Sequence, residues 1–370
     1  MNKKKYAILL LGLSIYIFIS IGQERKPIEE LETINGVGYD LNKSNKAEAE
    51  YSLPLSLSIF KADGSRINAV TTERGNNIGE VIQNRQRRLN KKFVQGQETV
   101  VLIGEEYART GIKSIIEDRI RNPETNDRAF MAVCNGKSEE FFNVKNTGYS
   151  SASAYMEGLI EAARTFNFYS ENFKLYDAYV RIAAEGRSLV LPFLDIKDEG
   201  IEMTGLAFFK EDKMVLKLDF EDSKALSFLK YDNVTGMASL QKSSKEYIDF
   251  EGKTGKRKVK CYKEGEKYRF TISIKFSGNV INNEMYSNIT KDSEVRKKFE
   301  KDLEKQLEKE CYEFINKMQN QYKMDCIGLG REAAAKFGRR KNIDWNEVVS
   351  NAKIDVNVKV AVDTQGRGDY

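Results

Sequence analysis

Residues 268–276 read Tyr-Arg-Phe-Thr-Ile-Ser-Ile-Lys-Phe, and this stretch decides how the second half of the chain folds. Aromatic and β-branched apolar residues alternate there with Arg, Thr, Ser and Lys. A period of two places every apolar side chain on one face of a strand, which is the pattern of an antiparallel strand with one buried and one solvated face. The stretch therefore predicts an antiparallel sheet that is covered on its apolar face.

The cover is predicted by a long amphipathic stretch that begins after Asp292 and Ser293. Apolar residues recur there at steps of three and four, namely Val295, Phe299, Leu303, Leu307, Cys311, Phe314, Ile315, Met318 and Tyr322. These steps line one face of a helix of about eight turns, with Glu and Lys on the opposite face. Coiled-coil pairing is the alternative, but steps of four drift away from a repeat of about 3.5 residues. We therefore expect the helix to pack on its own sheet.

Shorter elements around these two complete an α+β second half. Strands are predicted at 203–209 and 214–220, joined by a polar turn, and at 237–240, 247–250, 259–262 and 354–362. Asp222 is expected to cap a short helix. Gly328 and Gly330 are expected to break the chain before a helix that ends near Phe337, and Trp345 is expected to mark another packed segment.

The first half alternates between short apolar runs and helical patterns, which is typical of an α/β region. Buried strands are predicted at 98–103 and 129–134, because each is a continuous apolar run of the kind that helices cover on both faces. Helices are predicted at 76–93, at 105–121 with an interruption near Gly111, and at 138–142, 152–166 and 175–184. An extended piece is predicted at 188–194. Strands at 34–39 and 47–60 are expected to form a hairpin across a turn at 42–46, with Pro54 favouring an edge or first-strand position.

Residues 195–202 (Asp-Ile-Lys-Asp-Glu-Gly-Ile-Glu) are the most charged and least periodic stretch in the middle of the chain. We place the domain boundary there, so that the chain divides into residues 1–23, 24–196 and 203–370. The second part is then an α/β region of one or two subdomains. The third part is an α+β domain with an antiparallel sheet and a long packed helix.

The amino terminus carries three lysines, Lys3 to Lys5, followed by an uncharged apolar run from Tyr6 to Ile21. About ten Ile, Leu and Phe residues in this run favour bilayer insertion by about 3 to 6 kcal/mol. As a helix the run spans about 25 Å, slightly less than a hydrocarbon core of about 30 Å, so it lies between a signal peptide and a short anchor. The lysines favour an orientation with everything from Glu24 onward outside. A buried core helix fits poorly, because no polar face interrupts the run.

The composition narrows the possible chemistry. Histidine is absent, which removes Ser-His-Asp and Cys-His nucleophiles, histidine acid–base catalysis and most catalytic zinc sites. Sixty basic and 55 acidic residues give a net charge of +5 without a clustered basic face, so a nucleic-acid partner is not expected. No C-x-x-C pair occurs, so we expect small buried cysteines instead of a metal site or a disulfide framework, at Cys134, Cys261, Cys311 and Cys326.

Two glycine motifs and several carboxylates resemble functional sites. Residues 328–333 (Gly-Leu-Gly-Arg-Glu-Ala) resemble a dinucleotide fingerprint, but they follow a predicted helix where that motif requires a strand. Residues 252–254 (Gly-Lys-Thr) resemble a phosphate loop, but Tyr247 occupies the position of its first glycine, so a surface turn is expected. The sequence does not show whether any two carboxylates converge as a glycosidase pair does, the candidates being Asp118, Glu124, Asp195, Asp198 and Asp219. We therefore assign no catalytic, cofactor-binding or metal-binding residue, and we do not expect an enzyme.

Five sequence blocks are distributed over nearly all of the chain after Gln23. They are Gly-Val-Gly-Tyr-Asp at 36–40 after Glu30-Leu31, Val-Leu-Ile-Gly-Glu-Glu-Tyr-Ala-Arg-Thr-Gly-Ile at 101–112, Arg-Asn-Pro-Glu at 121–124, Thr-Gly-Leu-Ala-Phe-Phe-Lys at 204–210, and the turn at 322–330. In this order, after a lysine-rich signal, they resemble the Ger(x)C family of spore germination proteins, the C subunits of germinant receptors. The resemblance implies a membrane-tethered, non-enzymatic subunit on the outer face of the inner spore membrane. We expect no cofactor. It also implies two multi-pass partners, the A and B subunits, which sense nutrients such as amino acids or sugars.

One position departs from the family pattern. Members typically end the signal with Leu-x-Gly-Cys, whose cysteine receives diacylglycerol, whereas Gln23 follows Gly22 here and has no thiol to acylate. The apolar run is then either retained as an anchor or cleaved after Gly22, because Ser20 and Gly22 satisfy the small-residue rule. We favour retention, because a single-pass helix can replace the lipid tether.

Two other classes of protein stay open at this point. An exported solute-binding protein would have two α/β domains around a cleft, and the alternation at 268–276 argues against that architecture. A carboxylate-dependent wall hydrolase is the other alternative.

Overall fold

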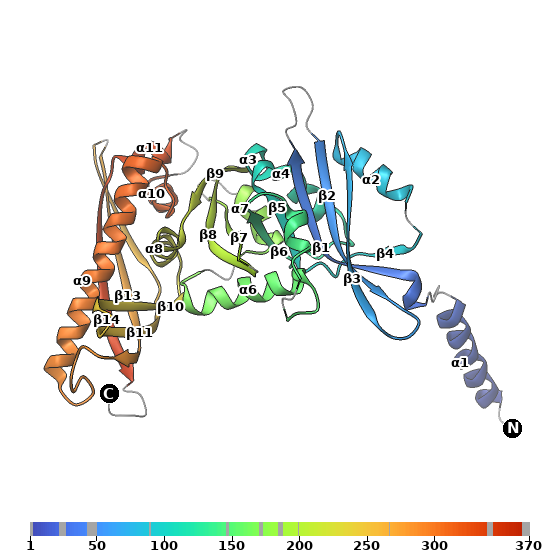
Figure 1. The fold of residues 1–370 in the computed structure, drawn as a ribbon, viewed down its shortest axis with the longest axis horizontal. Helices are drawn as coiled ribbons and strands as arrows, with labels where there is room; N and C mark the ends of the chain where they lie inside the picture. The colour runs from blue at the N-terminus through green and yellow to red at the C-terminus, as the bar shows by residue number, and fades with distance from the viewer. Residues whose placement is uncertain are drawn as a thin grey trace.

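The computed structural model describes residues 3–21, 27–42, 50–88, 90–145, 148–169, 173–183, 188–198, 200–265, 267–338 and 343–364. Two β-sheets follow one another along an elongated body (Figure 1). Helix α1 (Lys3–Ile21) lies at one end of this body, and the second sheet with helix α9 (Ser293–Lys317) lies at the other. In the described part of the chain, no helix combines the length and the apolar content that a membrane span requires.

The first sheet, sheet A, has nine strands. They are β1 (Leu31–Asn42), β2 (Glu50–Phe60), β3 (Arg66–Gly75), β4 (Lys92–Val94), β5 (Val100–Gly104), β6 (Phe130–Cys134), β7 (Val190–Lys197), β8 (Gly200–Lys210) and β9 (Lys213–Leu218). Eight of them follow the order β3-β2-β1-β5-β6-β7-β8-β9, and β4 pairs with β1. Strands β1, β5, β6 and β7 are parallel, and antiparallel hairpin strands extend the sheet on both sides. The α/β prediction for the first half is confirmed as a mixed sheet.

Helices cover both faces of sheet A because its central strands are apolar on both sides. In β5, Val100 and Leu102 belong to one apolar core, and Val101 and Ile103 belong to the other. Helices α5 (Ser138–Phe142) and α6 (Ala152–Phe166) contribute to the first core. The second core is covered by α2 (Ile78–Gln86), α3 (Glu105–Thr110), α4 (Lys113–Arg121) and α7 (Leu175–Ala183). A 3-10 turn, η1 (Ile28–Glu30), precedes β1.

The second sheet, sheet B, has five strands. They are β10 (Thr235–Ser243), β11 (Glu246–Thr254), β12 (Lys258–Glu264), β13 (Lys267–Asn283) and β14 (Lys353–Thr364). Strand β13 contains the alternating stretch 268–276 and pairs with β11 and β12 as predicted for an antiparallel strand, but the closing strand β14 pairs with β13 in parallel. The α+β prediction is therefore confirmed, although its sheet is not antiparallel throughout.

Helix α9 lies on sheet B, as its apolar stripe predicts (Figure 1). Its side chains Phe299, Leu303 and Leu307 belong to the same core as the apolar residues of β13. Asp292 caps its first turn by accepting from the backbone of Glu294 at 2.8 Å. The remaining helices of this half are α8 (Phe220–Lys230), the π-helical continuation η2 (Met318–Tyr322), α10 (Leu329–Phe337) and α11 (Trp345–Ser350).

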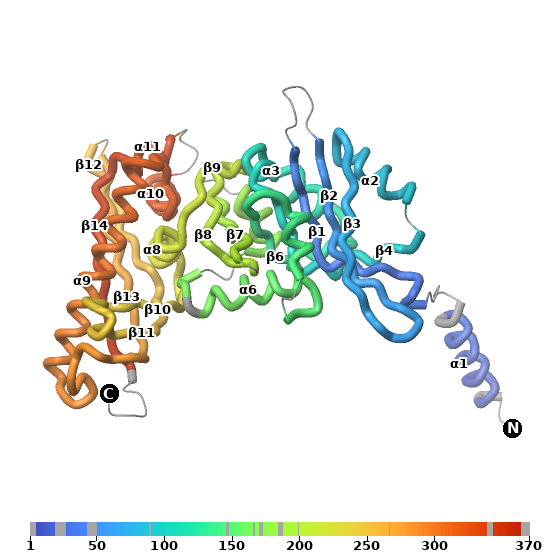
Figure 2. The backbone as a smooth tube through the Cα atoms, in the orientation of Figure 1, coloured from blue at the N-terminus to red at the C-terminus, as the bar shows by residue number. Residues whose placement is uncertain are grey.

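The stretch expected to be an aperiodic break at 195–202 is not a loop. Strands β7 and β8 lie side by side there (Figure 2). They form an antiparallel hairpin in which Asp195 pairs with Glu202 and Ile196 with Ile201. The sequence did not reveal these strands, because their charged residues lie at the exposed turn end of the hairpin. Strands β8 and β9 thus complete sheet A from the far side of the proposed boundary.

Three other local predictions were wrong. The helix expected over 76–93 ends at Gln86, and Phe93 belongs to β4. Pro54 is not on an edge strand, because β2 lies between β1 and β3; its ring packs where Gly38 has no side chain. The cap of α8 is Asp219 and not Asp222, which lies inside the helix. The turn predicted at 42–46 extends outside the described residues.

Strand β14 is an edge strand, and side chains of helix α9 accept hydrogen bonds from backbone N–H groups on its open edge. The N–H groups of Val358, Val360 and Val362 donate to glutamate oxygens of α9 at 2.9, 3.2 and 3.0 Å. The acceptors are Glu308, Glu304 and Glu300, which we call the glutamate ladder. Four helical residues rise about 6 Å and two strand residues about 6.6 Å, so the two repeats stay in register over three steps. One further turn along α9, the hydroxyl of Tyr312 accepts from Val356 at 3.0 Å.

Candidate functional site

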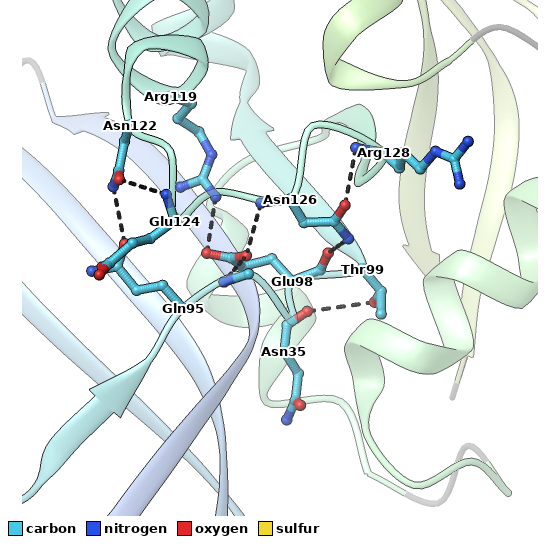
Figure 3. Close-up of polar contacts among 10 residues, drawn as sticks. Asn35, Gln95, Glu98, Thr99, Arg119, Asn122, Glu124, Asn126 and Arg128 are labelled. Atoms are coloured by element: carbon cyan, nitrogen blue, oxygen red, sulfur yellow. Dashed lines mark hydrogen bonds and ion pairs between the residues drawn. The ribbon is translucent and has the colours of Figure 1, made fainter. Parts of the chain in front are cut away.

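Glu98 and Arg119 form a buried ion pair at the amino ends of the parallel strands (Figure 3). Glu98 immediately precedes β5 and is 1% exposed, and Arg119 comes from α4 with an N···O distance of 3.1 Å. The carboxylate also accepts from the backbone of Gly96 at 2.9 Å. Burial by itself lowers the pKa of Arg119, but the neighbouring Tyr39 and Glu98 outweigh it and raise that pKa. The guanidinium therefore stays charged in the core.

The loop that contains the Arg-Asn-Pro-Glu block is held in place next to this ion pair by two asparagines. Asn126 donates from its amide to the carbonyl of Glu98 at 2.8 Å and accepts from the backbone of Arg128 at 3.0 Å. Asn122 accepts from the backbone of Glu124 at 3.0 Å and donates to Gln95 at 3.1 Å (Figure 3). These contacts show that the asparagines of this loop position its backbone.

The carboxyl ends of the parallel strands carry a second polar feature, centred on Asp40. Asp40 ends the Gly-Val-Gly-Tyr-Asp block, is 2% exposed, and accepts from the backbone of Ser138 at 2.8 Å. Burial raises the pKa of Asp40, and these backbone hydrogen bonds oppose the rise. A cavity of about 550 Å³ lies beside it, also lined by Glu50, Glu106 and Lys137. Ligands of α/β sheets bind at this edge, but Asp40 is engaged with the first turn of α5.

The five carboxylates considered for a hydrolase lie on different elements. Asp118 is in α4, Glu124 in the loop after it, Asp195 in β7, Asp198 in the turn to β8, and Asp219 caps α8. Asp195 accepts from Asn135 at 3.2 Å, and Asp219 accepts from the backbone of Asp222 at 2.8 Å, so both serve local structure. Among the described residues, no three His, Cys, Asp or Glu side chains are grouped so that they could hold a metal ion. All four cysteines are free and buried, as predicted.

Neither glycine motif has the geometry of a phosphate site. At 328–333, the buried carboxylate of Asp325 accepts from the backbone N–H groups of Leu329 and Gly330 at 3.0 and 2.7 Å, where a dinucleotide phosphate would lie. The prediction of a turn between helices is confirmed there. The prediction of a surface turn at 252–254 is wrong, because these residues belong to β11, and Thr254 is buried and accepts from the backbone of Val234 at 3.0 Å.

The two sheets are joined by a buried carboxylate, Asp222 of α8. It is 7% exposed and accepts from Lys317 at 2.7 Å and from the hydroxyl of Tyr322 at 2.8 Å. The hydrogen bond with Asp222 raises the pKa of Lys317. Burial raises the pKa of Tyr322, and its hydrogen bond to Asp222 adds to the rise. One carboxylate therefore holds the end of α9 and its continuation η2 against α8.

Replacing Asp222 with Asn should lower the free energy of unfolding by about 2 kcal/mol at pH 7, because two hydrogen bonds lose a charged acceptor. Urea denaturation followed by circular dichroism measures this loss. The folded-state pKa values of Lys317 and Tyr322 both lie above their unfolded values, so their contribution is complete below about pH 10 and is lost as the pH rises further. The difference between wild type and Asp222→Asn should therefore shrink above about pH 10. Glu221→Gln, at the exposed neighbouring position, is the matched control. Equal losses in the two variants would contradict the assignment.

Gly330 is required for packing and not for nucleotide binding. A Cβ atom at this position would lie 2.5 Å from Cβ of Trp345, so Gly330→Ala should cost about 1 to 3 kcal/mol through overpacking. It should also shift the fluorescence of Trp345, the only tryptophan in the chain. Gly328→Ala is the control, because no atom lies within 4 Å of its Cβ position; its positive φ of 75° costs about 1 kcal/mol without moving the indole. Identical fluorescence spectra for the two variants would rule out the packing role.

Two family models match the chain in sequence order. Residues 24–196 match the spore germination protein N-terminal domain, and residues 204–366 match the domain described as spore germination B3/GerAC like, C-terminal. Together the two models match the chain except for residues 1–23, 197–203 and 367–370.

Curated relatives match over most of their length. Spore germination protein GerQC of Bacillus cereus is 22% identical over 362 residues, which cover 97% of this chain and 98% of the relative. Spore germination protein A3 of Bacillus subtilis (strain 168) is 23% identical, with 90% of this chain and 91% of the relative covered. Spore germination protein B3 of the same organism is 22% identical, with 90% and 92% covered.

A solved structure has the same fold. The crystal structure of the GerBC protein is similar to this chain with a TM-score of 0.59 and 17% sequence identity. The match covers 89% of this chain and 97% of that structure. The likeness therefore extends over most of both chains.

Proposed function

The chain belongs to the Ger(x)C (GerAC-type) family of spore germination proteins, and on that premise we propose that it acts as the C-type subunit of a spore germinant receptor. Its role would be protein contact in nutrient-triggered germination. The observation that carries the proposal is the pair of family domains, which match residues 24–196 and 204–366 in order.

We further propose that the subunit is not an enzyme. The sequence has no histidine, and the carboxylates with defined partners cap helices or hold elements together. A solute-binding protein would have two α/β domains, whereas the second half here contains the largely antiparallel sheet B. The named relatives are likewise all spore germination proteins.

The tether is proposed to be the apolar run from Tyr6 to Ile21, retained as an uncleaved anchor. In the part of α1 whose side chains are described, the large apolar residues are exposed, from 45% at Ile17 to 84% at Phe18. An apolar helix without a polar face is stable in water only if something covers it, and a membrane is the cover that the family's role implies. Gln23 cannot be acylated, so the tether would rest on this run alone.

The proposed partners are the multi-pass A- and B-type subunits, and the proposed location is the outer face of the inner spore membrane. Deletion of the gene should abolish or weaken the response of spores to at least one nutrient, and the full-length chain should restore it. An unchanged response in every tested germinant mixture would remove the support for this role.

A separate experiment tests the tether. The full-length protein with a C-terminal tag should be found in the membrane fraction, and its amino-terminal sequence should begin at Met1 or Asn2. A soluble protein that begins at Gln23 would show that the run is a cleaved signal. This result would leave the receptor role intact, so the two proposals can fail independently.

We keep the division into residues 1–23, 24–196 and 203–370 as a proposal about domains. Its support is the position of the two family models, which meet between 196 and 204. In this division residues 203–370 contribute β9 and most of β8 to sheet A, so the two domains share one sheet. The shared sheet would hold them together more firmly than a flexible linker.

A further inference from the structure

A cavity of about 420 Å³, which we call the junction pocket, lies where elements of sheet A meet elements of sheet B. Its walls come from α7, the end of α8, the start of β12 and α10. Five basic side chains line it, namely Arg181, Lys230, Lys256, Arg257 and Arg331. A pocket of this size is within the range of small-molecule sites.

Two acidic side chains also line the junction pocket, so basic groups exceed acidic groups by five to two. Both acids are engaged with Arg257. Asp232 accepts from the backbone of Arg257 at 2.7 Å, and Glu332 lies 3.8 Å from its guanidinium. The guanidinium also donates to the carbonyls of Leu229 and Ile327 at 2.8 and 2.9 Å. Arg257 therefore holds the wall together, and basic groups remain in excess over acidic groups in the lining.

Lys230 is the pocket cation whose charged nitrogen is buried without a hydrogen bond in the described part of the chain. This nitrogen lies 5.5 Å from the ring centroid of Phe208 and 5.7 Å from that of Tyr231. The negative charge of Asp325 is close enough to act on the pKa of Lys230 and favours its charged form. Both oxygens of that carboxylate, however, accept from the backbone of α10. Buried ammonium groups are normally paired, because an unpaired one loses its hydration without replacement.

Two basic side chains lie beside Tyr231 in this pocket. Arg181 donates to its hydroxyl at 3.4 Å, and its guanidinium lies 5.8 Å from the ring centroid. Burial alone would raise the pKa of Tyr231, but Lys230 and Arg181 outweigh burial and lower that pKa. Burial also lowers the pKa of Lys230 itself. A negative charge in the pocket would be stabilised by both cations.

We propose that the junction pocket binds a small oxyanion, a free molecule that carries a phosphate or carboxylate group, with Lys230 as its central ligand. Arg181 lies beside this position, and the exposed Lys256 and Arg331 line the mouth of the pocket. A lipid headgroup is the other source of such a group, but α1 lies at the far end of the body from α10 (Figure 1). The bound anion would connect α7 and α8 with α10, and thus sheet A with sheet B.

This proposal does not depend on the receptor role, and the full-length protein in detergent micelles tests it. The probes are inorganic phosphate and succinate, each compared with sodium chloride at the same ionic strength. Isothermal titration calorimetry should show saturable binding of at least one probe, and the melting temperature should rise with its concentration. If neither probe binds beyond the chloride control, the proposal is overturned. Binding that appears only with vesicles of anionic lipid would overturn it in favour of a headgroup site.

Variants separate a binding role from a structural one. Lys230→Met should reduce affinity at least tenfold, while the melting temperature without anion stays the same or rises, because an unpaired buried charge is removed. Arg331→Gln, at the exposed mouth, should reduce affinity severalfold and provides the test if Lys230→Met does not fold. Lys245→Met is the matched control, because Lys245 is exposed and outside the pocket. An equal loss of affinity in Lys245→Met, or unchanged affinity in both pocket variants, would exclude a specific site.

Discussion

Replacing Arg119 with Met is expected to lower the free energy of unfolding by about 3 to 5 kcal/mol, because it leaves the carboxylate of Glu98 buried without its partner charge. Glu98 is 1% exposed and Arg119 8% exposed, so water replaces little of the lost interaction. The carboxylate would keep its backbone donor at Gly96 but no cation. Chemical denaturation at neutral pH, monitored by circular dichroism, measures the effect.

The double variant Glu98→Leu/Arg119→Met separates the net contribution of the ion pair to stability from the destabilisation caused by leaving one charge buried alone. It should recover part of the loss, because no charge remains buried, but not all of it, because the Gly96 N–H loses its acceptor. Arg121→Met on the same helix is the control. Its ion pair with Glu117 is solvent-exposed, so we expect a change below about 0.5 kcal/mol. A loss of similar size in Arg121→Met would show that the buried position of Arg119 is not the cause.

Replacing the glutamate ladder, Glu300, Glu304 and Glu308, with Ala is expected to cost about 3 kcal/mol in total. Three N–H groups of β14 lose a charged acceptor, and each loss is about 1 kcal/mol when water can partly replace the carboxylate. The opened edge of β14 should also pair with other molecules, because an unprotected edge strand is a template for association. Denaturation gives the stability, and sedimentation velocity detects the oligomers.

Two further variants make the ladder prediction specific. Glu→Gln at the same three positions should retain part of the stability, because the amide oxygen still accepts a hydrogen bond without the charge. Glu310→Ala/Glu313→Ala removes exposed glutamates of the same helix and should leave the protein monomeric and nearly unchanged in stability. If the triple alanine variant were as stable and as monomeric as this control, the ladder would have no protective role.

The elements that the sequence predicted correctly are those whose burial is set by near neighbours. The alternation from Tyr268 to Phe276 repeats every two residues, and the stripe of α9 repeats every three or four, so each pattern identifies its buried face locally. The start of α9 after Asp292 is likewise set locally, because its cap is a contact over two residues. The buried strands β5 and β6 were recognisable because both of their faces are covered and their runs are continuously apolar.

The elements that the sequence missed depend on partners far along the chain. Strand β3 is mostly exposed or half-buried and is ordered by pairing with β2, so it has no clear period of its own. The charged hairpin of β7 and β8 was mistaken for a break because its pairing, not its apolar content, makes it a strand. Pairing at long range leaves no periodic signal in a single stretch.

The sequence by itself determined the two fold classes, the long helix on its sheet, the absence of histidine chemistry and the family. Only the tertiary structure decided that β8 and β9 complete sheet A, that Asp222 joins α8 to α9, and that the glutamate ladder covers β14. It alone brought Arg181, Lys230 and Arg331 into one pocket. The physical reason is that a burial pattern repeats within a few residues and is therefore visible in a short stretch of sequence. Hydrogen bonds and charges act between side chains that folding brings together from as far as 150 positions apart.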